Sequence, residues 1–143
     1  MKPKLINIKA IDHVVLRTAD IGSMLGFYRG VLGCEIEREL QEIGLTQLRA
    51  GSALIDLVPV DSELGRQGGG LPSQDGRNMD HLCLLIDRVD EHELIGYLRA
   101  AGVAVQDFQE RYGADGFGRS LYINDPEGNV VELKLARELS AAD

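Results

Sequence analysis

The sequence has no tryptophan, only two cysteines among its 143 residues and an aromatic content of 5%. Cys34 and Cys83 form no CxxC pair and are too few for the disulfide framework of a small secreted domain. No apolar run approaches the roughly 18 residues that a membrane-spanning helix needs. The basic segment 1–10 lacks the long apolar run of a secretory signal. We therefore expect a cytoplasmic protein.

Positive charge is also scarce. The chain has 15 Lys and Arg against 23 Asp and Glu, which gives a formal net charge of −8 at pH 7. Non-specific affinity for nucleic acid comes from clustered Lys and Arg, so this balance argues against a nucleic-acid partner. The 44% of hydrophobic residues suffices for a core. We expect no membrane partner either, and a small-molecule substrate as the ligand.

What the chain does contain is an internal repeat. Residues 11–16 (IDHVVL) recur as residues 79–84 (MDHLCL), at a shift of 68 positions (79 − 11). Each copy is a short aliphatic and β-branched run, which predicts a buried strand. The repeat therefore predicts two modules of similar structure.

Each module continues with a predicted helix and three strands. The first helix would be capped by Asp20 or Ser23 and the second by Asp90, and Gly33 and Gly102 would end them. The later strands of the first module begin near Cys34 and cover about 45–50 and 53–58. Those of the second begin near Val103 and cover about 119–123 and 130–135, with a tight turn at 125–129. The predicted fold class is α+β, built of two βαβββ modules.

The modules would lie in a single domain, 1–143, as module 10–60 and module 79–136 joined by linker 61–78. The linker contains three consecutive glycines and few apolar residues, which predicts a mobile connection or lid. A second glycine-rich loop is predicted at 112–118, before the penultimate strand.

Charged residues lie inside the predicted strands. His13 and His81 occupy equivalent positions in the two copies, and Asp56 and Glu132 each lie in the last strand of a module. A carboxylate among aliphatic residues is costly to bury unless it is paired or bound to a cation. Packed with pseudo-symmetry, the modules would bring these four side chains together. Two imidazoles with one or two carboxylates suit Fe(II), Mn(II), Zn(II) or Ni(II). Taken singly, a core histidine or a solvent-facing Glu132 would also explain them.

These residues resemble a known family. Asp12-His13 at the start of a strand, the helix residues Phe27-Tyr28 and Val31-Leu32-Gly33, and the segment 125–129 (DPEGN) before Glu132 resemble the vicinal oxygen chelate superfamily. Its members include glyoxalase I, fosfomycin-resistance transferases, extradiol dioxygenases and bleomycin-resistance proteins. The resemblance covers residues 10–136. It implies an open, cup-shaped mixed sheet around a divalent metal ion, in a homodimer.

The resemblance also implies a ligand set. His13, His81 and Glu132 fall at the three widely shared metal positions, and Asp56 falls where glyoxalase I carries a fourth ligand. The metal would be Ni, Zn, Fe or Mn. It would chelate two neighbouring oxygens of the substrate and stabilise a developing oxyanion.

Two catalytic residues follow from the same resemblance. Arg17, four residues after His13 and on the same strand face, matches an arginine that glyoxalase I uses near its glutathione carboxylate. Tyr122, ten residues before Glu132, falls where extradiol dioxygenases and fosfomycin transferases carry an active-site tyrosine. A phenol there can donate a hydrogen bond to a metal-bound oxygen.

Three further residues are predicted to bind substrate. Cys83 shares the strand face of His81. Tyr112 and Arg119 flank the glycine-rich loop, together with Arg111, and would hold an anionic substrate group.

The function expected from the sequence is that of a metal-dependent lyase, isomerase or thiol transferase of the glyoxalase type, acting on a small oxygenated metabolite. An extradiol ring-cleaving dioxygenase is one alternative. It would lack its usual additional acid–base histidine, because the third histidine, His92, falls on a predicted helix. A non-enzymatic, drug-sequestering protein of the bleomycin-resistance type is the other.

Overall fold

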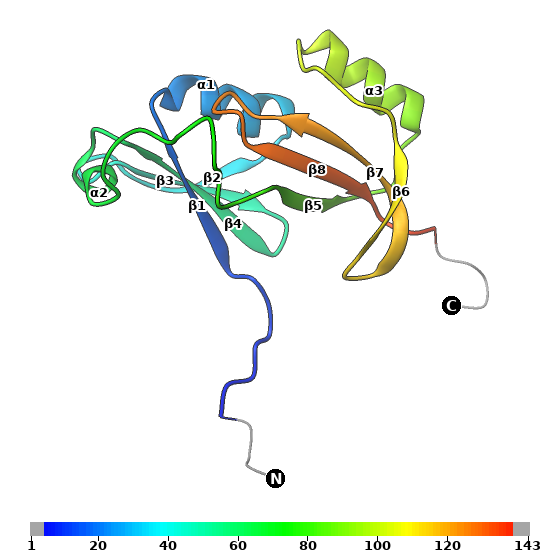
Figure 1. Cartoon of the computed structure of the whole chain (residues 1–143), viewed down its shortest axis with the longest axis horizontal. Coiled ribbons are helices and arrows are strands. Elements are labelled where there is room, and N and C mark those ends of the chain that lie inside the picture. The colour runs from blue at the N-terminus through cyan, green and yellow to red at the C-terminus, as the bar shows by residue number, and fades with distance from the viewer. Residues whose placement is uncertain (1–4, 139–143) are drawn as a thin grey trace. The chain divides into compact units, whose positions relative to one another are not determined.

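A computed structural model of the chain describes residues 5–138. The chain divides into two compact units, residues 1–72 (unit 1) and residues 73–143 (unit 2). Each unit has its own four-stranded mixed sheet and its own helical elements, as Figure 1 shows. The α+β fold class and the two βαβββ modules predicted from the repeat are confirmed.

Unit 1 contains four strands, two short α-helices and one π-helical segment. In chain order these are β1 (His13–Thr18), α1 (Ile21–Leu25), η1 (Gly26–Val31), β2 (Glu35–Leu40), β3 (Leu45–Ala50), β4 (Ala53–Pro59) and α2 (Glu63–Arg66). The strand order is β1-β4-β3-β2. β1 runs parallel to β4, and the other neighbouring pairs are antiparallel.

The first helix begins and ends where the sequence predicts. Asp20 caps it by accepting a hydrogen bond from the backbone N–H of Ser23 at 3.0 Å, and Gly33 follows it with a φ of +78°. Its second half is wound as a π-helix, in which the Leu32 N–H donates to the carbonyl of Phe27, five residues back. The sequence predicts an ordinary α-helix here, so the π-helical winding is a correction.

Unit 2 repeats the topology. Its elements are β5 (Leu82–Ile86), α3 (Glu91–Ala100), β6 (Gln109–Gly113), β7 (Gly116–Asn124) and β8 (Val130–Leu135), in the order β5-β8-β7-β6. Asp90 caps α3 through the N–H of Glu93, and Gly102 follows it with a φ of +80°. The predicted bounds of β8 are those observed. The longest helix in the described part of the chain, α3, has 10 residues, and no helix there could span a membrane.

Two sequence predictions about unit 2 are wrong. The strand expected from Val103 begins at Gln109, and the expected loop 112–118 consists of strand ends around a two-residue turn. Gly113 pairs with Gly116, whose φ of +88° turns the chain back. The register counted from this turn places the last pair at Gln109 and Ser120, so β6 starts there.

Each sheet has one face of apolar core residues and one face that carries polar side chains, the latter including the buried Val58 in unit 1. On the apolar face, the buried side chains are those of Leu16, Leu48, Ile55 and Leu57 in unit 1, and of Leu121, Ile123, Val131, Leu133 and Leu135 in unit 2. The helices add Met24, Phe27, Tyr28 and Leu98 to these cores. Because strand side chains alternate between faces, Asp56 and Glu132 project from the opposite faces. In each unit, therefore, a carboxylate lies on the face that does not contain these core residues.

Candidate metal centre

The four predicted ligands divide equally between the two units. His13 and Asp56 belong to unit 1, and His81 and Glu132 belong to unit 2. Across residues 5–138, no three His, Cys, Asp or Glu side chains are gathered closely enough to hold a metal ion. Each unit therefore carries one histidine and one carboxylate of the predicted ligand set.

In unit 2 the structure brings His81 and Glu132 together. Glu132 lies on β8 between Cys83 on β5 and Tyr122 on β7, which are its cross-strand partners. Its residue is only 6% exposed. Its Oε1 atom lies 3.1 Å from Nε2 of His81, which immediately precedes β5. A buried carboxylate thus faces a ring nitrogen.

The other ring nitrogen of each repeated histidine has an equivalent partner. Nδ1 of His81 lies 2.7 Å from the Asp80 carboxylate, and Nδ1 of His13 lies 2.7 Å from that of Asp12. A proton on Nδ1, donated to the aspartate, leaves the Nε2 lone pair available to a metal ion. The Asp12 hydrogen bond, followed by the negative charges of Asp56 and Asp12, raises the pKa of His13 against the effect of desolvation.

Tyr122 and Cys83 lie beside this pair. The Tyr122 ring packs edge-on against the His81 ring at a centroid distance of 5.4 Å. Cys83 is exposed, but partial burial of its thiol and then the neighbouring Glu132 carboxylate raise its pKa to about 11. Such a thiol is almost wholly protonated at neutral pH and is a poor nucleophile. The two predicted residues therefore share the Glu132 face, although their roles remain predictions.

Asp56 in unit 1 is buried and only partly hydrogen-bonded. Its residue is 3% exposed, and Oδ2 accepts a hydrogen bond from Gln47 Nε2 at 3.1 Å. Its other oxygen, Oδ1, is buried without a hydrogen-bond partner among the described residues. A buried carboxylate oxygen in this state is costly unless a cation meets it. This orphaned oxygen fits the predicted role of Asp56 as a metal ligand.

Arg17 has many contacts in the segment that follows β4. Its guanidinium donates to the carbonyls of Gly65, Gly69 and Gly70, over distances of 2.6–3.2 Å. The sequence predicts segment 61–78 as a mobile linker or lid. In the structure this segment contains the short helix α2, and the hydrogen bonds of Arg17 hold residues 65–70 against β1. The predicted catalytic role of Arg17 remains a prediction.

Replacing Arg17 with methionine is expected to release this segment. The variant loses four hydrogen bonds to backbone carbonyls. Amide hydrogen exchange of residues 66–70 should accelerate by about tenfold or more, because local opening no longer breaks charge-assisted bonds. Hydrogen exchange with mass spectrometry measures this. Arg38→Met on β2 is the control, and equal exchange in both variants would show that the contacts contribute nothing.

The two remaining predicted substrate-binding residues lie away from Glu132. Arg119 precedes Ser120 by one position and Tyr112 pairs with Phe117, so both project from the face opposite to Glu132. Arg119 forms a bidentate ion pair with Glu91 of α3, with both N–O distances 2.9 Å. Tyr112 packs edge-on against Phe117. The register thus does not bring these two side chains to the Glu132 face.

Sequence reasoning missed several residues of the polar faces. Asp12 and Asp80 were visible as the residues that precede the repeated histidines. Gln47 was also visible, because the two-residue gap between the predicted strands 45–50 and 53–58 pairs residue 50 with residue 53 and therefore residue 47 with residue 56. Lys134 follows Glu132 by two residues and so shares its face.

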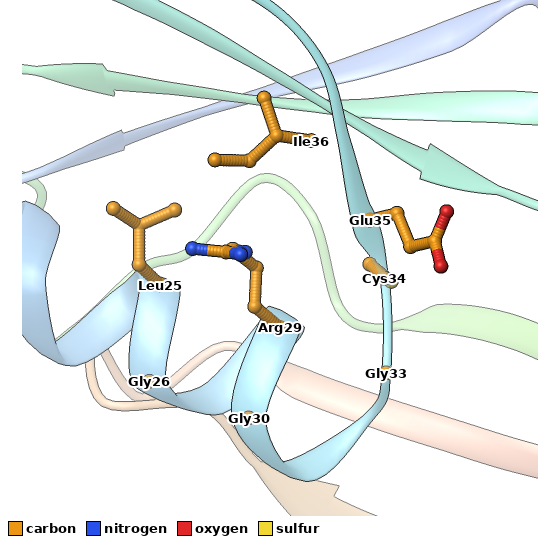
Figure 2. A pocket seen from close by; sticks show the side chains of 8 residues that line it. All are labelled: Leu25, Gly26, Arg29, Gly30, Gly33, Cys34, Glu35 and Ile36. Atoms are coloured by element: carbon orange, nitrogen blue, oxygen red, sulfur yellow. The ribbon is translucent and has the colours of Figure 1, made fainter.

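A separate pocket of about 660 Å³ lies in unit 1, between η1 and the start of β2. It is lined by Leu25, Gly26, Arg29, Gly30, Gly33, Cys34, Glu35 and Ile36. Figure 2 shows the Arg29 guanidinium directed between Leu25 and Ile36, whereas the Glu35 carboxylate points away. None of the predicted site residues lines this pocket.

Known proteins are similar to this chain over most of its length. The sequence profile named Glyoxalase/Bleomycin resistance protein/Dioxygenase superfamily matches residues 10–133. A virulence protein of Salmonella typhimurium is 30% identical over 127 residues, which cover 88% of this chain and 83% of that protein. An integron cassette protein from the mobile metagenome of V. cholerae has a TM-score of 0.74 and 29% identity, over 94% of this chain and 100% of that one. Lactoylglutathione lyase from Agrobacterium tumefaciens, with a TM-score of 0.65 and 24% identity over 91% and 96% of the two chains, shows the same fold.

Proposed function

The chain belongs to the Glyoxalase/Bleomycin resistance protein/Dioxygenase superfamily, and from this membership we propose that it is a divalent-metal-dependent enzyme of the glyoxalase type. It would act on a small oxygenated metabolite as a lyase, isomerase or thiol transferase. His13, His81, Glu132 and Asp56 would hold the metal ion. Nickel, zinc, iron and manganese all accept this set of nitrogen and oxygen donors. We also propose that the enzyme works as a homodimer.

The observation that carries the proposal is the geometry of His81 and Glu132. Their Nε2 and Oε1 atoms lie 3.1 Å apart. Two ligand bonds of about 2.1 Å that meet at a right angle have ends about 3.0 Å apart, so the spacing suits two neighbouring ligands of one ion. In the tautomer that donates Nδ1–H to Asp80, the Nε2 lone pair of His81 faces the Glu132 carboxylate and the two repel each other. A cation between these two atoms would turn that repulsion into attraction.

When bound, the metal ion would supply Lewis acidity toward two neighbouring substrate oxygens. The protein's own residues would orient the substrate and move protons around it. The Tyr122 phenol, on the Glu132 face and next to His81, is placed to donate a hydrogen bond to a substrate oxygen that gains negative charge. Cys83 borders the same face, and its raised pKa suits contact with substrate better than nucleophilic attack.

The test is metal loading followed by assays chosen by the metal. The chain is purified without chelator or affinity tag, its metal content is measured by plasma mass spectrometry, and the metal-free form is titrated with Ni, Zn, Mn and Fe(II). We expect about one ion per chain. Nickel or zinc leads to assays with glutathione hemithioacetals, and iron to catechols with O₂, which would support a dioxygenase. If none of the four ions binds, the proposal fails and a drug-sequestering protein becomes the better candidate.

A further inference from the structure

Two positively charged side chains share the Glu132 face of unit 2 without belonging to the proposed ligand set. Lys134 follows Glu132 by two residues on β8 and pairs with Ser120 on β7. Arg111 on β6 pairs with Gly118, two residues before Ser120. Because alternate residues of a strand share a face, Arg111, Lys134 and Glu132 project from the same side of the sheet.

Arg111 lies one aromatic ring away from the His81–Glu132 pair. Its guanidinium carbon is 4.1 Å from the centroid of the Tyr122 ring, which packs against His81. Its Nη1 donates to the carbonyl oxygen and to Oγ of Ser120, at 2.7 and 2.9 Å. Nε and Nη2 have no hydrogen-bond partner among residues 5–138. The Ser120 contacts thus hold the guanidinium in place, while its Nε and Nη2 donors remain available to a ligand. Arg111 is half-buried.

Lys134 is a buried cation that forms no ion pair with the residues that the structure describes. Its residue is 4% exposed, and Nζ donates to the carbonyl of Gly116. Within the described residues, no carboxylate lies within 4 Å of Nζ. Glycines make room for it: a Cβ at position 113 would lie 2.7 Å from Nζ, and one at position 118 would lie 2.8 Å from Cε. Burial of an ammonium group is costly unless a negative group accompanies it.

The charges of this face therefore contrast with those of the chain. The face has two full positive charges, Arg111 and Lys134, against the single carboxylate of Glu132, in a chain of net charge −8. Glu132 is also the carboxylate that the proposed metal ion would neutralise. Once the metal ion neutralises Glu132, the positive charges of Arg111 and Lys134 are available to bind a negatively charged ligand.

We propose that Arg111 and Lys134 form a subsite for an anionic group of the substrate, a carboxylate or a phosphonate or phosphate. The inference rests on the proposed function, because the substrate's two neighbouring oxygens would lie at His81 and Glu132 while its anionic group extends past Tyr122. The substrate class is thus a small metabolite with vicinal oxygens and a negatively charged end. The register assigns this role to Arg111 and Lys134 in place of Arg119 and Tyr112.

One arm of the test uses metal chelators that differ only at their far end. Acetohydroxamic acid presents two neighbouring oxygens alone, succinohydroxamic acid adds a carboxylate, and 3-phosphonopropionohydroxamic acid adds a phosphonate. On the metal-loaded chain, calorimetry should show that at least one charged probe binds about tenfold or more tightly than acetohydroxamic acid. The stronger of the two charged probes identifies the group. Equal affinity for all three overturns the proposal.

Substitutions in unit 2 show which residues produce the gain in affinity for the charged probes. Arg111→Met and Lys134→Met should each remove most of the gain from the charged end and leave the affinity for acetohydroxamic acid within about twofold. Arg99→Met on α3 removes the same charge elsewhere in unit 2 and should keep the gain. The assignment is overturned if Arg119→Met loses the gain in affinity while Arg111→Met and Lys134→Met keep it. The anionic group would then bind on the opposite face of the sheet, where Arg119 lies.

A second arm does not depend on the metal. Inorganic phosphate is titrated into the metal-free chain and followed by NMR, and Arg111→Met should weaken its binding about tenfold whereas Arg99→Met should not. If the wild-type chain binds none of the four metal ions, the proposed function fails, but this arm still decides the subsite. Absence of phosphate binding to the metal-free wild-type chain overturns the subsite.

Discussion

Glu132→Gln is expected to lower the affinity of the chain for divalent metal ions by about a hundredfold or more, which exceeds the usual cost of losing a residue that only supports a ligand. Glutamine has nearly the same shape, so packing on β8 is kept while the charge is lost. Oε1 of the buried Glu132, 3.1 Å from His81 Nε2, is the carboxylate oxygen that we propose binds the ion. Competition with a chromophoric chelator measures the affinity.

The matched control for this prediction is Glu110→Gln. Glu110 lies on β6 of the same sheet and pairs with Arg119, so it projects from the opposite face. The Glu110→Gln variant should bind metal ions with an affinity within about twofold of wild type, because the charge of Glu110 is exposed and screened. His81→Ala should match the loss seen for Glu132→Gln. Wild-type affinity in Glu132→Gln would remove Glu132 from the ligand set.

Asp56→Leu is expected to stabilise the metal-free chain by about 1–3 kcal/mol, because it removes a buried carboxylate with one oxygen that lacks a partner among residues 5–138. The residues of β4 that share a face with Asp56 are Leu54 and Val58, so an aliphatic side chain suits this position. Urea denaturation in the presence of a chelator measures the free energy of unfolding. The same variant should bind metal more weakly if Asp56 is the fourth ligand.

Gln47 supplies the control for the stability change. It donates to Oδ2 of Asp56 at 3.1 Å, so Asp56→Leu leaves its amide without this acceptor. The double variant with Gln47→Leu removes both partners and should be at least as stable as Asp56→Leu alone. If Asp56→Leu instead destabilises the chain, the Asp56–Gln47 hydrogen bond has a structural role and the carboxylate is not held for a ligand.

The sequence was most informative where a short local signal decides the structure. The repeat of residues 11–16 at 79–84 predicted both modules, and Asp20 and Asp90 cap their helices as expected. The turn at 125–129 fixed β8, since Asp125 and Asn129 close it with a backbone hydrogen bond. These features depend on residues within a few positions of one another, which a sequence displays directly.

The errors arose where distant residues decide the structure. The start of β6 depends on pairing across the hairpin at residues 113–116. Five glycines or aromatics among residues 112–118 conceal this turn in the sequence. The contacts of Arg17 depend on the path of residues 65–70. The face of Arg119 was accessible from the sequence, because it lies three positions before Tyr122 and strand faces alternate. The face of Tyr112 could not be predicted in this way, because it depends on the pairing of Tyr112 with Phe117 across the hairpin.

The parallel pairing of the first and last strand in each unit has a consequence for synthesis on the ribosome. β1 ends at Thr18, but its partner β4 begins only at Ala53, and β5 ends at Ile86 long before β8 begins at Val130. Each first strand therefore leaves the exit tunnel without a partner and must wait for the rest of its unit to be translated. Chaperones that bind nascent chains would meet each of these strands before its parallel partner has been made. Unit 1 can close its sheet while unit 2 is still being made, so the repeat divides the folding of the chain into two successive events.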